Sequence, residues 1–254
     1  MHRLSLLMIG TKVLYFKELE STNLTAAELL KNKEVKEGAV IVSTYQNQGK
    51  GQEGNDWESE AGKNLLISVV LKPGFLKPEK QFALNKIVSL AVVEFVGKLL
   101  PNEVVKIKWP NDIYIGDKKV AGILITNSIT GNTFDSSVVG IGINLNQKFF
   151  LSNAPNPVSV YQISRKQYDL EESLDLLLEI FNRWYKLLEN GLFNSIDKNY
   201  LTSLYRFEEY HAFKIGAKEI EAKITDISKY GRLLLKGKNL KTYECDLKEV
   251  EFVI

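Results

Sequence analysis

The chain has 254 residues, of which 44% are apolar and 25% charged, a balance typical of a globular protein with one large domain and one small domain. Its net charge of +2 is too small for a dedicated nucleic-acid-binding protein. The single cysteine, Cys245, excludes an intrachain disulfide and a zinc site of paired cysteines. The two histidines, His2 and His211, argue against a histidine-rich metal site or a Ser-His-Asp triad.

No apolar stretch approaches the roughly 18 residues of a membrane span. The apolar run near the N-terminus is too short for a usual signal sequence and lacks a small-residue cleavage site. We therefore expect a cytoplasmic protein that does not bind membranes.

In the first hundred residues, apolar patterning predicts strands that alternate with helices. The expected strands are 13–16, 39–45 and 65–71, and the expected helices are 22–33 and 81–100. Ser21 or Thr22 is a suitable N-cap for the first helix. Between the second and third strands, residues 46–64 form a polar, glycine-rich loop that is too long for a simple turn.

The rest of the chain predicts a strand-rich block, two helices and a small β module. Strands are expected at 104–109, 113–115, from 118 onward and at 136–144, and helices at 170–189 and 193–205. From residue 211 the apolar period changes to two, which predicts strands at 211–215, 219–227, 232–236 and 242–245. We therefore divide the chain into domains 1–205 and 206–254.

Residues 106–124 are the most informative part of the chain, and they read Lys-Ile-Lys-Trp-Pro-Asn-Asp-Ile-Tyr-Ile-Gly-Asp-Lys-Lys-Val-Ala-Gly-Ile-Leu. Pro110 should end a strand or sit at a bulge, which holds Asn111 and Asp112 at a strand end. Lys119 can project from the returning strand, and Gly122 leaves a surface without a side chain for a flat ligand. A hairpin with solvated lysines would explain any one of these residues, but not the whole block.

The loop from Gln46 to Trp57 follows directly on a strand. Its glycines allow a close approach to a ligand, and successive amide groups can form an anion-binding nest. Lys50 adds a positive charge, and Trp57 adds a stacking surface. The loop is not a Walker loop, because no Gly-Lys-Ser/Thr sequence ends it, and it does not open a helix as a dinucleotide fingerprint does. Taken alone, a flexible surface loop explains it better.

Together these segments resemble the biotin–protein ligase family. The block at 108–124 matches the family's Lys-Trp-Pro-Asn-Asp and Lys-x-Ala-Gly-Ile motifs, and residues 49–57 are similar to its Gly-Arg-Gly-Arg-x-Gly-x-x-Trp loop. Ser21-Thr22-Asn23 resembles the Ser-Thr-Asn motif. Gln46 precedes the loop as in the family, and Gly140-Ile-Gly142-Ile-Asn144 resembles the Gly-x-Gly-x-Asn strand. With the trailing β module, the resemblance covers nearly the whole chain.

The resemblance implies an α+β fold, in which a mixed β-sheet with packed helices carries the site and a small SH3-like β-barrel module follows. It also implies that biotin and MgATP form biotinyl-5′-AMP and pyrophosphate. A lysine of a biotin carboxyl carrier protein, of acetyl-CoA carboxylase or a related carboxylase, then attacks the mixed anhydride. Larger members carry an N-terminal helix-turn-helix region, for which there is no room before Ser21. We therefore expect a ligase without DNA binding, and a homodimer is compatible with the sequence.

The resemblance also implies roles for individual residues. Lys119 would be the electrostatic catalyst at the biotin carboxylate and the phosphate, and Asp112 would orient the acceptor lysine or bind magnesium; no other metal ligand is expected. The implied biotin-binding residues are Ser21, Thr22, Asn23, Gln46, Lys50, Gly51, Gln52 and Lys119. The implied nucleotide-binding residues are Gly49, Lys50, Gly54, Trp57, Asn111, Gly122, Ile123, Gly142 and Asn144.

Structural roles compete with several of these functions. Ser21 and Thr22 can cap a helix, Lys118 fits a solvated hairpin position, and Trp109 fits the core better than an adenine platform. Lys50 and Gln52 stand where the family has arginines, which puts in doubt how strongly the loop holds phosphate. The functional alternatives are a lipoate–protein ligase, which shares the fold and the chemistry, and a non-catalytic biotin-binding protein.

Overall fold

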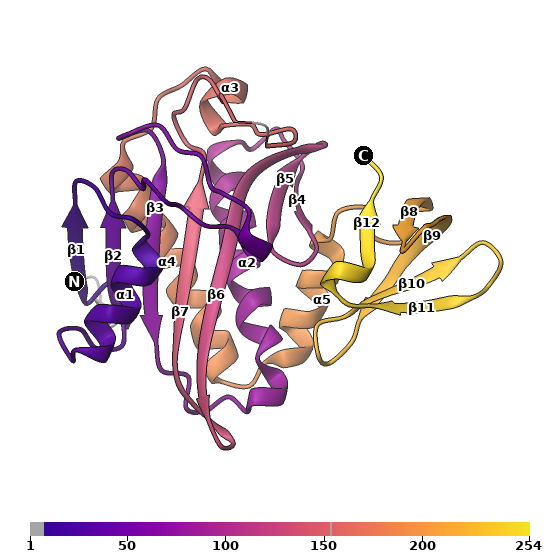
Figure 1. The fold of residues 1–254 in the computed structure, drawn as a ribbon, viewed down its shortest axis with the longest axis horizontal. Coiled ribbons are helices and arrows are strands. Elements are labelled where there is room, and N and C mark those ends of the chain that lie inside the picture. The colour runs from indigo at the N-terminus through magenta and orange to yellow at the C-terminus, as the bar shows by residue number, and fades with distance from the viewer. Residues whose placement is uncertain (1–7, 153) are drawn as a thin grey trace.

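The computed structural model describes residues 8–152 and 154–254, and its larger part is built on a seven-stranded mixed sheet (Figure 1). Across the sheet the order is β1-β2-β3-β7-β6-β5-β4, and every neighbouring pair is antiparallel except β1 and β2. The strands are β1 (Lys12–Phe16), β2 (Ala39–Ser43), β3 (Leu65–Leu71), β4 (Val105–Lys108), β5 (Asp112–Ile115), β6 (Lys118–Thr130) and β7 (Thr133–Ile143).

Helices cover the two faces of this sheet unequally. α1 (Thr22–Lys31) lies on one face, while α2 (Phe82–Leu99), α4 (Leu170–Glu189) and α5 (Phe193–Ser203) lie on the other (Figure 1). The strands serve both faces because their side chains alternate: Val40 and Val42 belong to the core under α2 and α4, whereas Ala39 and Ile41 pack toward α1. The predicted mixed sheet with packed helices is confirmed.

The C-terminal residues form a second, five-stranded antiparallel sheet in the order β11-β10-β9-β8-β12. Its strands are β8 (His211–Ile215), β9 (Lys218–Ile227), β10 (Leu233–Gly237), β11 (Thr242–Cys245) and β12 (Val250–Phe252). The sheet is consistent with the predicted SH3-like module, but in the described part of the chain its edge strands β11 and β12 do not pair with each other. The four expected strands are present. The fifth, β12, is too short for its alternation to be visible in the sequence.

Short helical elements complete the fold and were not predicted. α3 (Val160–Ser164) begins at a capping box formed by Ser159 and Gln162. The 3₁₀ helices are η1 (Gln52–Gly54), η2 (Pro78–Lys80) and η3 (Leu247–Glu249). Within the described residues, no helix has the combination of length and apolar character that crossing a membrane requires.

The two sheets share one apolar core. Phe213, Ile224 and Leu233 of the second sheet are buried in the same cluster as the residues under α2. The segment after β4 is hydrogen-bonded on both sides. Trp109 Nε1 donates to Gly231 O, in a turn of the second sheet, at 2.9 Å. Tyr200 Oη of α5 donates to Pro110 O at 3.1 Å. We propose that the boundary at 205–206 divides two sheets rather than two units that fold independently.

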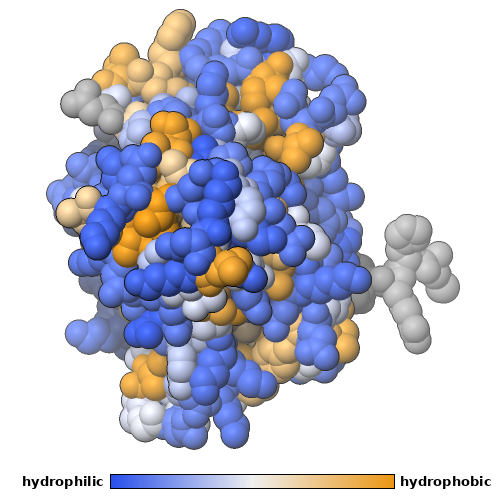
Figure 2. All heavy atoms as spheres, turned by 90° about the vertical axis from the view of Figure 1, so that its right-hand side faces the viewer, coloured by the Kyte–Doolittle hydropathy of each residue, from blue (hydrophilic) through white to orange (hydrophobic). Residues whose placement is uncertain are grey.

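The face of the molecule on the side of the second sheet is mostly hydrophilic, with apolar groups scattered over it (Figure 2). Tyr230, Leu240 and Ile254 are among the exposed apolar residues of this part of the chain. Singly exposed apolar side chains are normal on a protein surface. The second sheet therefore presents a mostly polar surface to solvent on this face.

Gly38 gives a test of how tightly the start of β2 is packed. Its φ is +84°, and a Cβ at this position would lie 1.9 Å from the Met8 carbonyl oxygen. We expect Gly38→Ala to destabilise the protein, because alanine brings both backbone strain and a clash with backbone. The matched control is Gly97→Ala in α2, where nothing lies within 4 Å of the added Cβ. That substitution should stabilise by about 0.5–1 kcal/mol. Thermal unfolding of both variants checks the prediction, and equal melting temperatures would contradict it.

Candidate active site

A cavity of about 510 Å³ lies between the large sheet, the loop after β2 and the C-terminal segment from η3 to β12. Its lining comes from segments far apart in the sequence. These are Ser21–Asn23 at the start of α1, Gln46, residues 50–52 and 55–57 of the loop, 108–112, Lys119, residues 122–124 and 140–142, and residues of 247–252. The motifs found in the sequence thus meet around one space.

Of the predicted site residues, three do not line this cavity. Gly49 lies behind the loop, where a Cβ would be 2.9 Å from the Trp57 carbonyl oxygen. Gly54 is exposed at the loop tip. Asn144 lies just past the end of β7, where its side chain Nδ2 donates to Val158 O at 3.2 Å. All the other predicted residues line the cavity.

At one end of the cavity, α1 and β3 form a compact polar cluster. Ser68 Oγ is hydrogen-bonded to Thr22 Oγ1 at 2.7 Å and to Asn23 Oδ1 at 2.6 Å, and Asn23 Nδ2 donates to Leu124 O. Asn23 sits directly over Gly140, where a Cβ would approach its side chain to 2.3 Å. Sequence analysis missed Ser68, although a serine within the apolar run Leu65–Leu71 was a signal.

Gln46 caps α1 in place of the expected side chain. Ser21 occupies the N-cap position, but it makes no side-chain capping bond. Instead, Gln46 Oε1 accepts a hydrogen bond from the backbone N–H of Thr22 at 2.7 Å. One side chain thus satisfies the helix terminus and also joins the loop to the polar cluster.

The floor of the cavity is made of glycines covered by an aromatic ring. Gly122 of β6 and Gly142 of β7 are paired across the two strands. A Cβ at Gly122 would lie 3.0 Å from the Trp57 ring, and one at Gly142 would lie 2.6 Å from it. The indole Nε1 of Trp57 is buried without a hydrogen-bond partner among the described residues. A buried donor left unpaired in a cavity is suited to a ligand acceptor.

The loop that carries Trp57 is closed on itself. Lys50 Nζ lies 2.9 Å from Asp56 Oδ1, and the backbone N–H of Trp57 donates to Gly49 O at 2.9 Å. Gly51 N also donates to Asn55 O at 2.6 Å. The lysine in place of a family arginine is therefore paired within the loop, and both partners are half or more exposed.

Lys119 and Asp112 form an ion pair at the centre of the cavity, with 2.6 Å between Nζ and Oδ1. Their side chains are 30% and 21% exposed. The Lys119 ammonium also lies 5.6 Å from the centre of the Trp57 ring. Asn111 is buried, and its side-chain amide donates to Ile123 O, which joins the end of β5 to β6.

A β-bulge aims Lys119 into the cavity. β5 pairs Ile113 with Ala121 but Tyr114 with Lys119, so Val120 is an extra residue in β6. In a regular strand Lys119 would lie on the same face as Ala121 and opposite Gly122. The bulge gives the core position to the fully buried Val120 and turns Lys119 to the face of Gly122.

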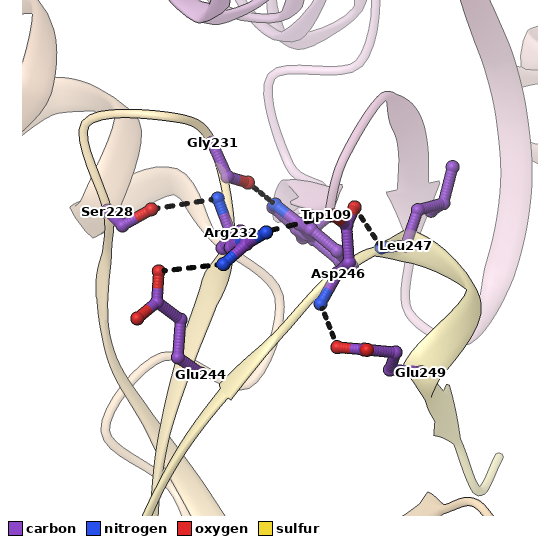
Figure 3. Close-up of polar contacts among 8 residues, drawn as sticks. All are labelled: Trp109, Ser228, Gly231, Arg232, Glu244, Asp246, Leu247 and Glu249. Carbon is purple, nitrogen blue, oxygen red and sulfur yellow. Dashed lines mark hydrogen bonds and ion pairs between the residues drawn. The ribbon is translucent and has the colours of Figure 1, made fainter.

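The C-terminal wall of the cavity is held by a polar network (Figure 3). Arg232 lies 3.5 Å from Asp246 and 3.7 Å from Glu244, and it connects the turn at 228–231 to the start of η3. Asp246 and Glu249 form a capping box around η3. Because Gly231 accepts the indole proton of Trp109, the same turn also contacts the block that ends β4.

The described residues contain no preassembled metal centre, because nowhere among them do three or more aspartate, glutamate, histidine or cysteine side chains come together. Magnesium commonly binds through one or two carboxylates together with substrate phosphates. Asp112 supplies such a carboxylate in the cavity, so the donor set fits a magnesium ion that arrives with a nucleotide.

Comparison with known proteins agrees with this geometry. The model of the biotin/lipoate A/B protein ligase family matches residues 15–144. The chain is 33% identical over 227 residues to biotin–[acetyl-CoA-carboxylase] ligase of Paracoccus denitrificans, and the match covers 86% of this chain and 93% of that protein. It is 34% identical over 140 residues to the bifunctional ligase/repressor BirA of Escherichia coli, where it covers 54% of this chain and 41% of BirA.

Among solved structures, biotin protein ligase from Aquifex aeolicus in complex with biotin and ATP matches with a TM-score of 0.79 and 26% identity. The match covers 96% of this chain and all of that chain. The chain belongs to the biotin/lipoate A/B protein ligase family, as a biotin–protein ligase.

Proposed function

We propose that this protein activates biotin with ATP as biotinyl-5′-AMP and transfers the biotinyl group to a lysine of a biotin carboxyl carrier domain. The observation that carries the proposal is the Lys119–Asp112 ion pair on a floor of glycines, in a cavity with the polar Ser21–Asn23 cluster at one end. A lipoate–protein ligase would use the same chemistry, but the Paracoccus denitrificans and Aquifex aeolicus relatives described above are biotin ligases.

Two anions must meet before they react in the activation step. A carboxylate oxygen of biotin bonds to the α-phosphorus of ATP, and the bond from that phosphorus to the bridging oxygen breaks, so pyrophosphate leaves with the electron pair. Lys119 is suited to reduce the repulsion between the carboxylate and the phosphate and to stabilise the charge that develops on the phosphoryl oxygens. Magnesium bound with the nucleotide adds charge neutralisation at the phosphates, and Asp112 would hold it.

The polar cluster at the other end of the cavity suits the ureido ring of biotin. Thr22 and Asn23 line the cavity, and the buried Ser68 behind them is hydrogen-bonded to both side chains, so they are positioned before the ligand arrives. Gln46 adds an amide beside them. We propose that these residues bind biotin, and that Lys50, Gly51 and Gln52 cover the adenylate and exclude water.

The nucleotide would lie against Trp57, whose ring covers the glycine floor. Trp57 offers a ring and an unpaired indole N–H, and Asn144 has a buried Oδ1 without a hydrogen-bond partner in the described residues. An unpaired amide oxygen is suited to accept from the amino group of a purine. Asn144 does not line the cavity, so this contact needs a local adjustment of the Val158 segment that holds its amide.

In the transfer step, the neutral amine of the acceptor lysine attacks the acyl carbon of the anhydride and AMP leaves. We propose that the carboxylate of Asp112, which lies in the cavity beside Lys119, orients that amine. We propose that the carrier belongs to acetyl-CoA carboxylase or a related carboxylase. A cytoplasmic location, a homodimeric state and the lack of a DNA partner remain predictions; sedimentation of the purified protein with and without DNA tests the last two.

We predict biotin-dependent ATP–pyrophosphate exchange by the purified protein. Radiolabelled pyrophosphate should enter ATP when biotin is present and should not do so when lipoate replaces biotin. Exchange with lipoate alone would favour the lipoate alternative. Biotin binding without any exchange would favour a non-catalytic protein.

Lys119→Ala should remove adenylation while sparing the fold and biotin binding. Loss of one positioned charge in a site of this kind costs on the order of 10²–10³ in rate. Lys118→Ala is the matched control, because Lys118 is the adjacent residue of β6, is exposed and does not line the cavity. Single-turnover formation of biotinyl-5′-AMP measures both variants. Equal rates in the two would show that Lys119 is not the catalyst.

Gly142→Ala should disturb the seat of Trp57, because the new methyl group would lie 2.6 Å from the indole ring. We expect a fall in the kcat/KM for ATP of about 10²-fold, since a displacement of about 1 Å in a reactive site has an effect of this size. Gly74→Ala is the control, because its Cβ meets no atom within 4 Å. Steady-state kinetics and tryptophan fluorescence provide the readouts, and an unchanged kcat/KM for ATP would rule out Trp57, seated on Gly142, as a nucleotide surface.

A further inference from the structure

Lys108, the first residue of the Lys-Trp-Pro-Asn-Asp motif, lines the cavity, although the sequence indicated no role for it. It is the last residue of β4, where it pairs with Asp112 across the β4–β5 hairpin. Its side chain is partly buried. Lys108 therefore brings a further ammonium group into the cavity, in addition to those of Lys50, Lys119 and Lys248.

The charge of Lys108 has no close anionic partner in the described part of the chain. Asp112, the nearest candidate, is paired with Lys119 at 2.6 Å, and no described carboxylate lies within 4.0 Å of the Lys108 ammonium. The ammonium instead lies 5.3 Å from the ring centre of Tyr114 and 5.2 Å from that of Phe252. Burial is the main cause that lowers the pKa of Lys108. The negative charge of Asp112 opposes this shift, and the positive charges of Lys119 and Arg206 add to it.

The strand order places Lys108 on the far side of Lys119 from the polar cluster. Ser68 lies on β3 and Gly140 on β7. Lys119 follows on β6 and Asp112 on β5, and Lys108 lies at the edge on β4. Neighbouring strands are about 4.8 Å apart, so about two strand spacings separate the backbones of Lys108 and Lys119. Phe252 of the C-terminal segment lies next to the Lys108 ammonium, and Lys248 and Glu251 of the same segment also line the cavity.

An in-line displacement needs an anion site at that far end. The leaving pyrophosphate departs from the side of the α-phosphorus opposite to the attacking carboxylate oxygen. With biotin at the Ser68 end and the phosphorus near Lys119, the departing group lies toward β4. A partly buried ammonium without a carboxylate partner is suited to a strongly charged phosphate group.

We infer that Lys108 holds the β- and γ-phosphates of ATP and then the pyrophosphate leaving group. This inference rests on the proposed function. Lys108 takes no proton and forms no bond in the step: the electron pair of the broken bond stays on pyrophosphate, and the fixed ammonium stabilises that charge. Phe252 keeps the ammonium in place from the second sheet, and Lys248 and Glu251 of the same segment bring one charge of each sign to the cavity.

The first test compares Lys108→Met, which keeps an unbranched apolar side chain, with Lys108→Arg, which keeps the charge. Lys108→Met should raise the KM for ATP and the inhibition constant of pyrophosphate by about tenfold or more, as for the loss of one charge-assisted contact. Biotin affinity by calorimetry should not change, and Lys108→Arg should recover most of the loss. Lys118→Met, at the exposed start of β6, is the control. Unchanged constants for ATP and pyrophosphate in Lys108→Met would overturn the inference.

A second measurement uses the unaltered protein, so it does not depend on a variant that folds. An amine-acylating reagent should label Lys108, and mass spectrometry should show that MgATP and pyrophosphate protect it whereas AMP does not. Equal labelling with and without pyrophosphate would overturn the inference. If the same preparation shows biotin-dependent exchange, that negative result concerns Lys108 alone. Absence of exchange would instead contradict the proposed function.

Discussion

The arrangement of the site depends on one extra residue in β6. Because Val120 has no partner in β5, the alternation of the strand is broken between Ala121 and Lys119. Val120 remains in the core, and Lys119 emerges on the same face as Gly122, within 2.6 Å of Asp112. A strand fixes its side chains more firmly than a loop does, so the bulge combines a rigid support with a direction that a regular strand could not give.

Around the Lys119–Asp112 pair, glycines in the sheet leave space for groups from other segments. Gly122 and Gly142 are neighbours across β6 and β7, and Gly140 lies under Asn23. The space over the first two is filled by Trp57, which comes from a loop closed by its own ion pair and backbone hydrogen bonds. The ring is therefore held by its seat on the glycines and by the geometry of the loop. A larger side chain at either glycine would act on the loop as well as on the floor.

The second sheet contributes to the site, because residues of η3 and β12 line the cavity. Its turn at 228–231 accepts the indole proton of Trp109, and Arg232 links that turn to η3, the segment that begins the far wall of the cavity (Figure 3). The shared apolar core makes these contacts part of the fold rather than a loose docking. The Lys108 ammonium, at the β4 edge of the large sheet, thus lies near the ring of Tyr114 from β5 and the ring of Phe252 from the second sheet.

The sequence by itself determined strands that are continuous apolar runs, such as β3, helices with strong apolar periodicity, such as α4, and the family through its motifs. It also identified many of the residues that meet around the cavity, because those motifs are short and keep their spacing. It did not reveal Ser68, the cap by Gln46, the place of Lys108 in the cavity or the strand β12, since each depends on residues distant in the chain. The direction of Lys119 was likewise decided only in three dimensions, because a bulge is a mismatch between two strands and neither strand carries its signature alone.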